Sequence, residues 1–578
     1  MLLGRKGFMK ARNSELKYLI FVLLAASTVY VVGHWNAIVD PYVINDDVRQ
    51  QVYWMQKWYD EELFPDDLLT LYARYYVPWG IKAVYRLGAP FMVPVQFSKV
   101  ITGILYVITA CFIFGLGLEF KDKIVALVIV CCYFFFTTFL RKISGGLSQS
   151  FGFPLLCAYL FFLARNNLLA AAFTIMFASV LNPYIFVLTS ATHGIYLIAN
   201  YGALPVNKLL GRRSESLVDE VSTDRGPLTG ENPIGPPNQI AITKLFLLNV
   251  PILVGAFLMS LKYILLKPDG IGNLVTWSQI VGHVEYTAAG RYQIFPVPSI
   301  FYELTMPWRG IFPFDEWGHV AGWIGMAFIL ALSICAWTHK NFFANLHGFR
   351  VYAYLLPASL LMWCISYVVL MRLFIPGRYL EFSLTVFYCV FTGVTAKLAL
   401  DRLGLKRIIF PWVVVSAVFV GALRSHELGI YDYSEYQDLY RFLRTTPKSS
   451  LIAGHPVLMD PFPAYSHRKA FVTYELSHTW IDSYWEIIEK RTFDFFKAYY
   501  SDNPDDLRQF CDYYGIDYLL VREEDFSPRI LQKGEVYFEP FRSQIQELVR
   551  NKSQFAALSA KAFPVVYRSS GIRVLKMR

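Results

Sequence analysis

Two adjacent carboxylates, Asp46 and Asp47, are the side chains in this sequence whose type and position best suit catalysis. They follow the first long apolar segment closely and begin a stretch in which Val48, Val52 and Met55 recur at helical spacing. A helix N-terminus stabilises the ionised form of a carboxylate, and a general base must be ionised before it can accept a proton. We therefore predict that Asp46 and Asp47 are catalytic residues.

A structural role competes with this prediction. An aspartate at a helix start also caps the helix, because its oxygens accept hydrogen bonds from the free N–H groups of the first turn. For a second pair, Asp66 and Asp67, which precedes another amphipathic stretch, we favour capping. For Asp46 and Asp47 both roles stay open, because these residues lie close to the predicted membrane surface, where a lipid-linked substrate would present its head group.

Basic residues form the second set of candidates. A cation can bind an anionic group and stabilise negative charge that develops during a reaction. Lys and Arg are depleted on the non-cytoplasmic side of membrane proteins, so those predicted to lie there stand out, although such residues also snorkel at span ends. The predicted substrate-binding residues are Arg49, Arg141, Lys142, Arg291, Arg309 and Arg378. Arg378 is the strongest of them because Pro376-Gly377 breaks the helical pattern just before it.

The sequence gives no pattern of metal ligands. His283 and Glu285 lie two residues apart with no third ligand in evidence, and seven of the eight cysteines lie in apolar segments. We therefore predict no metal-binding residues and no cofactor, and leave dependence on a divalent metal open.

The elements that position these residues must be membrane spans. The chain has 578 residues, of which 55% are hydrophobic and only 17% charged, and its mean hydropathy is +0.37. Soluble domains carry about 25% charged residues, so the composition excludes a soluble globular protein, a disordered chain and a disulfide scaffold. The net charge of +10 does not imply a nucleic-acid partner, because basic residues of membrane proteins collect in cytoplasmic loops.

Eleven apolar segments are predicted to cross the bilayer. They lie at residues 18–38, 98–118, 124–140, 151–165, 168–181, 184–200, 243–265, 320–337, 351–371, 379–400 and 407–424. Basic residues before the first span and in three loops that follow even-numbered spans predict a cytoplasmic N-terminus. The loops 39–97 and 267–319 then lie on the non-cytoplasmic side, and the Gly- and Pro-rich loop 205–240 is a cytoplasmic linker.

We expect two domains, a transmembrane module at residues 1–424 and a soluble, non-cytoplasmic α/β domain at residues 425–578. Short strands are predicted at 451–453, 470–474 and 516–521, helices at 482–500 and 505–514, and a terminal hairpin at 564–575.

This organisation resembles the GT-C superfamily of membrane glycosyltransferases. A first span is followed by a large outer loop that opens with an acidic pair and two interfacial helices. Bacterial aminoarabinose and protein O-mannosyl transferases of that superfamily often open this loop with Asp-Glu-x-Arg, which Asp46, Asp47 and Arg49 match with Asp in the second place. The loop 141–150 lacks the acid that many relatives carry there, and the Trp-Trp-Asp signature of oligosaccharyltransferases is absent.

The resemblance implies an enzyme, a hexosyl or pentosyl transferase. It would move a sugar, with inversion, from a polyprenyl-phosphate donor to a hydroxyl of a glycan, lipid or protein acceptor. The resemblance assigns Asp46 as the base that acts on the acceptor, with Asp47 and Arg49 orienting the acceptor or the base. It also implies a multi-pass protein of a bacterial inner membrane, in contact with membrane lipids, with its active site on the outer face.

Two other classes stay open. A transporter or flippase of a lipid-linked or glycan substrate usually keeps charges deep within its spans and often shows inverted repeats. Here Lys262 and Glu381 lie near span ends, and no repeat is visible. The third class is a non-catalytic membrane scaffold whose outer domain binds a partner.

Overall fold

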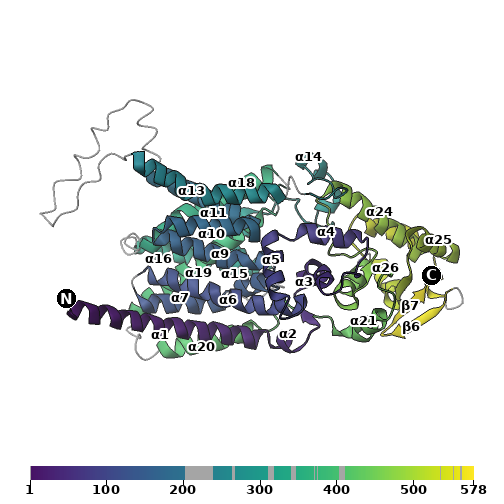
Figure 1. Ribbon diagram of the computed structural model, residues 1–578, viewed down its shortest axis with the longest axis horizontal. Coiled ribbons are helices and arrows are strands. Elements are labelled where there is room, and N and C mark those ends of the chain that lie inside the picture. Colours follow the sequence, from purple (N-terminus) through teal and green to yellow (C-terminus); the bar gives the residue numbers. More distant parts are fainter. Residues whose placement is uncertain are drawn as a thin grey trace.

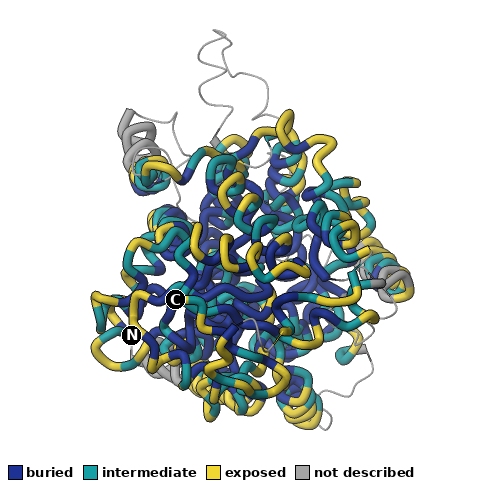
Figure 2. The backbone as a smooth tube through the Cα atoms, turned by 90° about the vertical axis from the view of Figure 1, so that its right-hand side faces the viewer, coloured by how far each residue is buried: buried dark blue, intermediate teal, exposed yellow. Residues whose placement is uncertain are grey.

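The computed structural model describes twelve stretches of the chain. These are residues 2–120, 122–201, 239–262, 267–309, 318–339, 347–369, 372–373, 375–402, 410–533, 536–550, 552–559 and 563–578. Most of the predicted linker, residues 205–238, lies outside them. The described chain is mostly helical, and a buried core runs through it, as Figure 2 shows.

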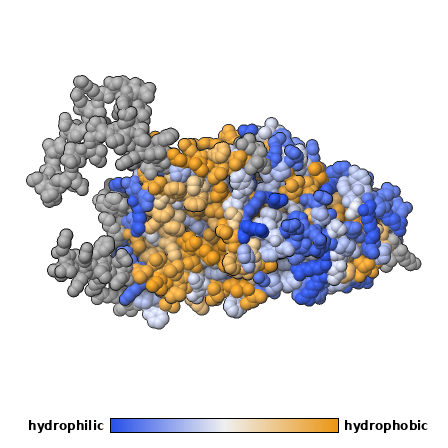
Figure 3. Space-filling model, in the orientation of Figure 1, coloured by the Kyte–Doolittle hydropathy of each residue, from blue (hydrophilic) through white to orange (hydrophobic). Residues whose placement is uncertain are grey.

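A bundle of helices occupies one half of the molecule, at the positions of the eleven predicted spans (Figure 1). Its members are α1 (Leu2–Gly33), α6 (Pro94–Leu118), α7 (Lys123–Phe135), α9 (Gly152–Ala164), α10 (Leu168–Leu181), α11 (Pro183–Tyr201), α13 (Gln239–Ser260), α16 (Gly318–Thr338), α18 (Arg350–Val368), α19 (Gly377–Arg402) and α20 (Phe410–Arg424). Figure 3 shows an apolar surface over this half and a polar surface over the other.

By length and composition, four helices of the described chain can cross a membrane. They are Glu15–Gly33, Pro94–Leu118, Arg350–Val368 and Gly377–Asp401, and five shorter apolar helices accompany them. The count of eleven spans therefore stays a prediction. The division between α10 and α11 has a clear local cause, since Pro183 cannot continue α10 and the Asn182 side chain accepts a hydrogen bond from the Ile185 N–H at 3.1 Å.

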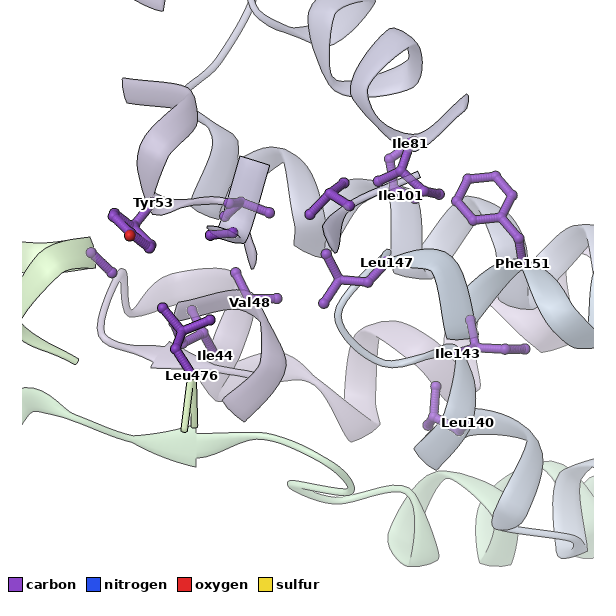
Figure 4. Close-up of a cluster of buried hydrophobic side chains, with 14 of the residues drawn as sticks. Ile44, Val48, Tyr53, Ile81, Ile101, Leu140, Ile143, Leu147, Phe151 and Leu476 are labelled. Atoms are coloured by element: carbon purple, nitrogen blue, oxygen red, sulfur yellow. The ribbon is translucent and has the colours of Figure 1, made fainter. Parts of the chain in front are cut away.

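The first outer loop forms α3 (Asp46–Gln51), the 3₁₀ helix η1 (Tyr53–Trp58), α4 (Leu68–Tyr76) and α5 (Trp79–Gly88). Our prediction of one interfacial helix from Asp46 onward was wrong in two respects. The helix changes to 3₁₀ geometry after Gln51, and its apolar face, including Val48, packs inside the protein beside Ile44 and Leu476 (Figure 4). A helical apolar stripe fits a protein core as well as a bilayer, so periodicity alone does not separate the two.

Of the pair Asp66 and Asp67, predicted to cap the second helix of this loop, Asp67 does so. The Asp67 carboxylate accepts a hydrogen bond from the Thr70 N–H at 2.9 Å and caps α4. Asp66 has a positive φ of 46° and precedes the cap.

The C-terminal segment contains a five-stranded sheet in the order β4-β3-β5-β7-β6. Its strands are β3 (Leu451–Ala453), β4 (Lys469–Ala470), β5 (Tyr518–Arg522), β6 (Val565–Ser569) and β7 (Ile572–Lys576), and helices α21 (Gln437–Arg444), α24 (Asp482–Tyr499), α25 (Pro504–Tyr514) and α27 (Phe541–Val549) accompany it. β3 pairs in parallel with β4 and β5, whereas β7 runs antiparallel to β5 and β6. The predicted strand at 470–474 was wrong beyond Ala470, because a buried apolar run need not be a strand.

Both outer loops are tied to this segment at one end of the bundle. β1 (Val43–Ile44) pairs antiparallel with β2 (Tyr431–Asp432), and an isolated bridge joins Leu274 to Ile481. Residues distant in the sequence therefore meet where the helices end. The assignment of residues 425–578 to a separate domain stays a prediction.

Candidate functional site

Helix α3 is capped by Asn45, the residue before the acidic pair. The Asn45 Oδ1 accepts a hydrogen bond from the Asp47 N–H at 3.1 Å, and its Nδ2 donates to the Gly429 carbonyl at 2.8 Å. The Asp46 carboxylate shares the same N–H at 3.0 Å. The Asp47 carboxylate instead accepts a hydrogen bond from the Gln50 side chain at 2.8 Å, so capping does not explain Asp47.

Asp47 lines a cavity of about 80 Å³ where the first outer loop meets the ends of the bundle. The other lining residues are Gln51, Tyr76, Pro78, Leu147, Ser148, Gln149, Asn182, Pro183, Tyr184, Arg378 and Phe382. Burial, aided by Asp46 and Glu475 and opposed by Arg378, raises the pKa of Asp47 to about 6. Asp46, the predicted base, is not among the residues that line this cavity.

Arg378 brings a positive charge to the cavity that Asp47 lines. It lies in the first turn of α19, and its guanidinium is 4.9 Å from the ring centre of Tyr184. The Pro376-Gly377 break seen in the sequence precedes this helix start. A cation and a carboxylate on one cavity can bind an anionic group and accept a proton at neighbouring points.

Next to the cavity, four charged side chains form a network in which Asp460 is buried and the other three are half-buried. Arg291 donates a hydrogen bond to Glu475 at 3.1 Å. The Arg49 guanidinium lies 3.5 Å from Glu475 and 3.9 Å from Asp460. Burial raises the pKa of Asp460, aided by Glu475, while Arg49 opposes the rise. The network joins the first outer loop, the 267–309 loop and the C-terminal segment.

The amide of Gln50 connects this network to Asp47. Its Nε2 lies 2.8 Å from the Asp47 carboxylate and 3.5 Å from that of Glu475. Aromatic faces hold one of the arginines in place, since the Arg291 guanidinium lies 3.9 Å from the ring centre of Tyr474. Glu475 and Asp47 are therefore separated by a single amide group, so the negative charge of Glu475 lies close to the Asp47 carboxylate.

Asp460 and Glu475 are the charged residues of this site that sequence reasoning missed. They lie in the predicted soluble domain, more than 400 residues from Asp47, and no motif surrounds them. The sequence predicts only that the loop 39–97 and residues 425–578 lie on the same side of the membrane. That prediction does not say which acidic residues of the C-terminal segment approach the first loop.

The remaining predicted cations lie in different surroundings. Lys142 forms an ion pair of 2.9 Å with the buried Glu381, and Arg141 is exposed. Arg309 ends helix α15 (Ile300–Arg309), and its side chain lies outside the described part of the chain. The structure therefore places Arg378 on the cavity, Arg49 and Arg291 beside it, and Lys142 on a carboxylate partner.

Among the residues that the structure describes, no group of three or more His, Cys, Asp or Glu side chains could hold a metal ion. His283 and Glu285, the pair noted in the sequence, lie 3.9 Å apart.

No protein-family model and no curated protein sequence matches the chain. Solved structures resemble it. ArnT from Cupriavidus metallidurans bound to undecaprenyl phosphate aligns over 97% of this chain and 98% of its own, with 11% identity and a TM-score of 0.50. The archaeal oligosaccharyltransferase AglB from Archaeoglobus fulgidus, in complex with an inhibitory peptide and a dolichol-phosphate, aligns over 90% of this chain and 71% of its own, with 11% identity and a TM-score of 0.46. The likeness to ArnT is one of fold, and it extends over nearly the whole chain.

Proposed function

We propose that this chain is a glycosyltransferase that moves a sugar, with inversion, from a polyprenyl-phosphate donor to an acceptor hydroxyl on the non-cytoplasmic side of the membrane. The observation that carries the proposal is the cavity at the end of the bundle, which Asp47 and Arg378 line together. The fold supports it, since the ArnT structure of the same fold holds undecaprenyl phosphate.

The chemistry assigned to the cavity is a direct displacement. The acceptor oxygen attacks the anomeric carbon and forms the new glycosidic bond, while the bond from that carbon to the donor phosphate oxygen breaks. The lipid phosphate leaves with the electron pair, and the Arg378 guanidinium stabilises its charge. Asp47 takes the proton of the acceptor hydroxyl. We assign this role to Asp47 rather than Asp46 because Asp47 lines the cavity.

The direct test measures release of polyprenyl phosphate by the full chain reconstituted in vesicles, with a panel of polyprenyl-phosphate hexoses and pentoses as donors. A membrane extract supplies the acceptor, so the release of polyprenyl phosphate can be measured without identifying that acceptor. We expect release from at least one donor, and release at least about a hundredfold slower from the Asp47→Asn variant. The control is Asp438→Asn, a change at an exposed carboxylate of α21. Equal release by the wild type and Asp47→Asn would contradict the proposal.

Removing the charge of Arg378 tests whether its guanidinium stabilises the leaving lipid phosphate. A hydrogen bond to a charged group contributes about 1.5–3 kcal/mol, so Arg378→Gln should lower kcat/KM for the donor about tenfold to hundredfold. The exposed Arg141 provides the comparison, and Arg141→Gln should change kcat/KM less than threefold or so. An effect at Arg141 as large as that at Arg378 would place the phosphate elsewhere.

The pH profile tests the protonation state of the base. Asp47 is protonated, and cannot accept a proton, below its raised pKa of about 6. We therefore expect kcat/KM to rise with pH between about 5 and 7 and then level off. The negative charge of Glu475 helps to raise that pKa, so Glu475→Gln should move the rising limb to lower pH. A shift to higher pH would show that Glu475 does not act on the base in this way.

The side of the membrane requires a separate test. The outer loops and the C-terminal segment meet at one end of the bundle, and the basic residues support a cytoplasmic location for the other end. A periplasmic reporter fused after Arg578 should therefore be active, and a reporter that works only in the cytoplasm should be silent. The reverse result would place the cavity on the cytoplasmic side.

A further inference from the structure

A second concave site lies in the first outer loop, separate from the cavity at Asp47. It is a groove of about 1080 Å³ bounded by η1, α4 and α5. Its lining residues are Trp54, Lys57, Trp58, Glu61, Phe64, Asp66, Asp67, Leu68, Thr70, Leu71, Arg74, Trp79 and Lys82. The two sites share a wall, since Tyr76 and Pro78 line the cavity while Arg74 and Trp79 line the groove.

Two cations of the groove lack a carboxylate partner. Among the residues that the structure describes, neither Arg74 nor Lys82 forms an ion pair. Arg74 and Lys82 line the same groove, and burial, together with repulsion from Arg74, lowers the pKa of Lys82 to about 8. Lys57, by contrast, donates hydrogen bonds to the carbonyls of Glu61 and Leu63. Unpaired like charges in a partly buried site favour binding of an anion.

Indole rings form much of the wall around these cations. Trp54 and Trp58 pack edge to face at 5.7 Å, and the Lys82 ammonium lies 5.8 Å from the ring centre of Trp54. Trp79 begins α5 and completes the aromatic lining. Tryptophan combines an apolar face with an N–H donor, and it is enriched where proteins meet lipid head groups.

Exposed apolar side chains lie between the groove and the helix bundle. α5 is followed directly by the apolar helix α6, and Leu87 and Phe91 between the groove and α6 are 76% and 82% exposed. Figure 1 shows α5 beside the bundle, with α4 extending from it toward the C-terminal segment. Exposed apolar side chains on an interfacial helix are expected to enter the bilayer.

The cations without an ion pair and the acids of the groove lie toward opposite ends of α4. Arg74 lies in the last turn of that helix. Glu61 and Asp66 precede its N-terminus, where Lys57 is already held by the Glu61 and Leu63 carbonyls. The phosphate of a membrane lipid lies nearest the acyl chains, and its hydroxyl or amine groups project further into water. A lipid head group therefore matches the groove in direction, with phosphate at the cations and donors at the acids.

We propose that this groove binds the phosphate-bearing head group of an anionic membrane lipid, with the phosphate held by Arg74 and Lys82 and the rest of the head group against Trp54, Trp58 and Trp79. The site is distinct from the proposed donor cavity. Its occupation does not require glycosyl transfer, so the two proposals fail or succeed independently.

The test titrates the full chain, delipidated in a neutral detergent, with short-chain phosphatidylglycerol and follows tryptophan emission and the Tm. We expect saturable binding. Loss of one charge-assisted contact removes about 1.5–3 kcal/mol, so Arg74→Gln and Lys82→Gln should each weaken binding about tenfold or more. Lys82→Arg, which keeps the charge, should retain most of the affinity.

Matched controls decide between the groove and general surface charge. Arg441→Gln removes an exposed basic residue of α21 that does not line the groove, and it should leave the affinity within about twofold. Equal losses at Arg441 and Lys82, or none at Arg74 and Lys82, would overturn the proposal. Inorganic phosphate is the second probe, and binding of phosphate alone as tight as that of the lipid would assign the site to a soluble anion and overturn the lipid assignment.

Discussion

Asp47→Asn should lower turnover by about 10² to 10⁴, the usual contribution of a positioned general base. The amide keeps the size of the side chain and its contact with Gln50, but it cannot take a proton from the acceptor hydroxyl. Because Asn45 caps α3, the substitution removes no cap, and the free energy of unfolding should change by less than about 1 kcal/mol. The measurement is kcat for polyprenyl phosphate release at matched expression and at pH 8, where the native carboxyl is ionised.

Asp46→Asn is the informative comparison, because the resemblance to the GT-C superfamily assigns Asp46 as the base. Its carboxylate accepts the Asp47 N–H, a contact that an asparagine oxygen can keep, and it does not line the cavity. Turnover should therefore fall less than about tenfold. If Asp46→Asn abolishes turnover and Asp47→Asn does not, the base is Asp46 and the cavity is not the reaction site.

The sequence was informative about elements that depend on local pattern. Apolar length located the helices of the bundle, and a glycine after Tyr514 marked the end of α25, where Gly515 has a positive φ of 69°. The acidic pair at the start of α3 and Arg378 at the start of α19 could be singled out because a helix start and a Pro-Gly break are local signals, and their roles stay predictions. The pattern does not say which of Asp46 and Asp47 lines the cavity, because adjacent residues differ only in the direction that their side chains take on the helix.

Contacts between segments that are distant in the sequence could not be predicted from local sequence patterns. Glu475 follows β4 in a stretch that reads as an ordinary buried run. Contacts between distant residues, such as the pairing of β1 with β2 and the hydrogen bond between Tyr72 and His478, bring the C-terminal segment to the first loop. Lys142 is a residue for which a distant contact changes the predicted role. Its position in an outer loop suggested a phosphate ligand, but the partner that it meets, Glu381, is on a helix more than 200 residues away.

Lys142→Met should be among the most destabilising single substitutions in the bundle. The Lys142 ammonium lies 2.9 Å from the Glu381 carboxylate, whose side chain is 2% exposed. Removing the cation leaves a buried carboxylate without its partner, and such a loss costs about 3–5 kcal/mol. The measurement is the free energy of unfolding of the purified chain in mixed micelles, from a denaturant titration.

The double variant Lys142→Met/Glu381→Leu separates the cost of an unpaired charge from the value of the pair. Replacing both partners with apolar side chains removes the buried charge, so most of the lost stability should return. Arg165→Gln is the exposed counterpart. Its pair with Glu119 is as short, at 2.7 Å, but the arginine is 49% exposed, so the loss should stay below about 1 kcal/mol. If Lys142→Met costs no more than Arg165→Gln, water or another cation reaches Glu381, and Lys142 is again available as a ligand for the donor phosphate.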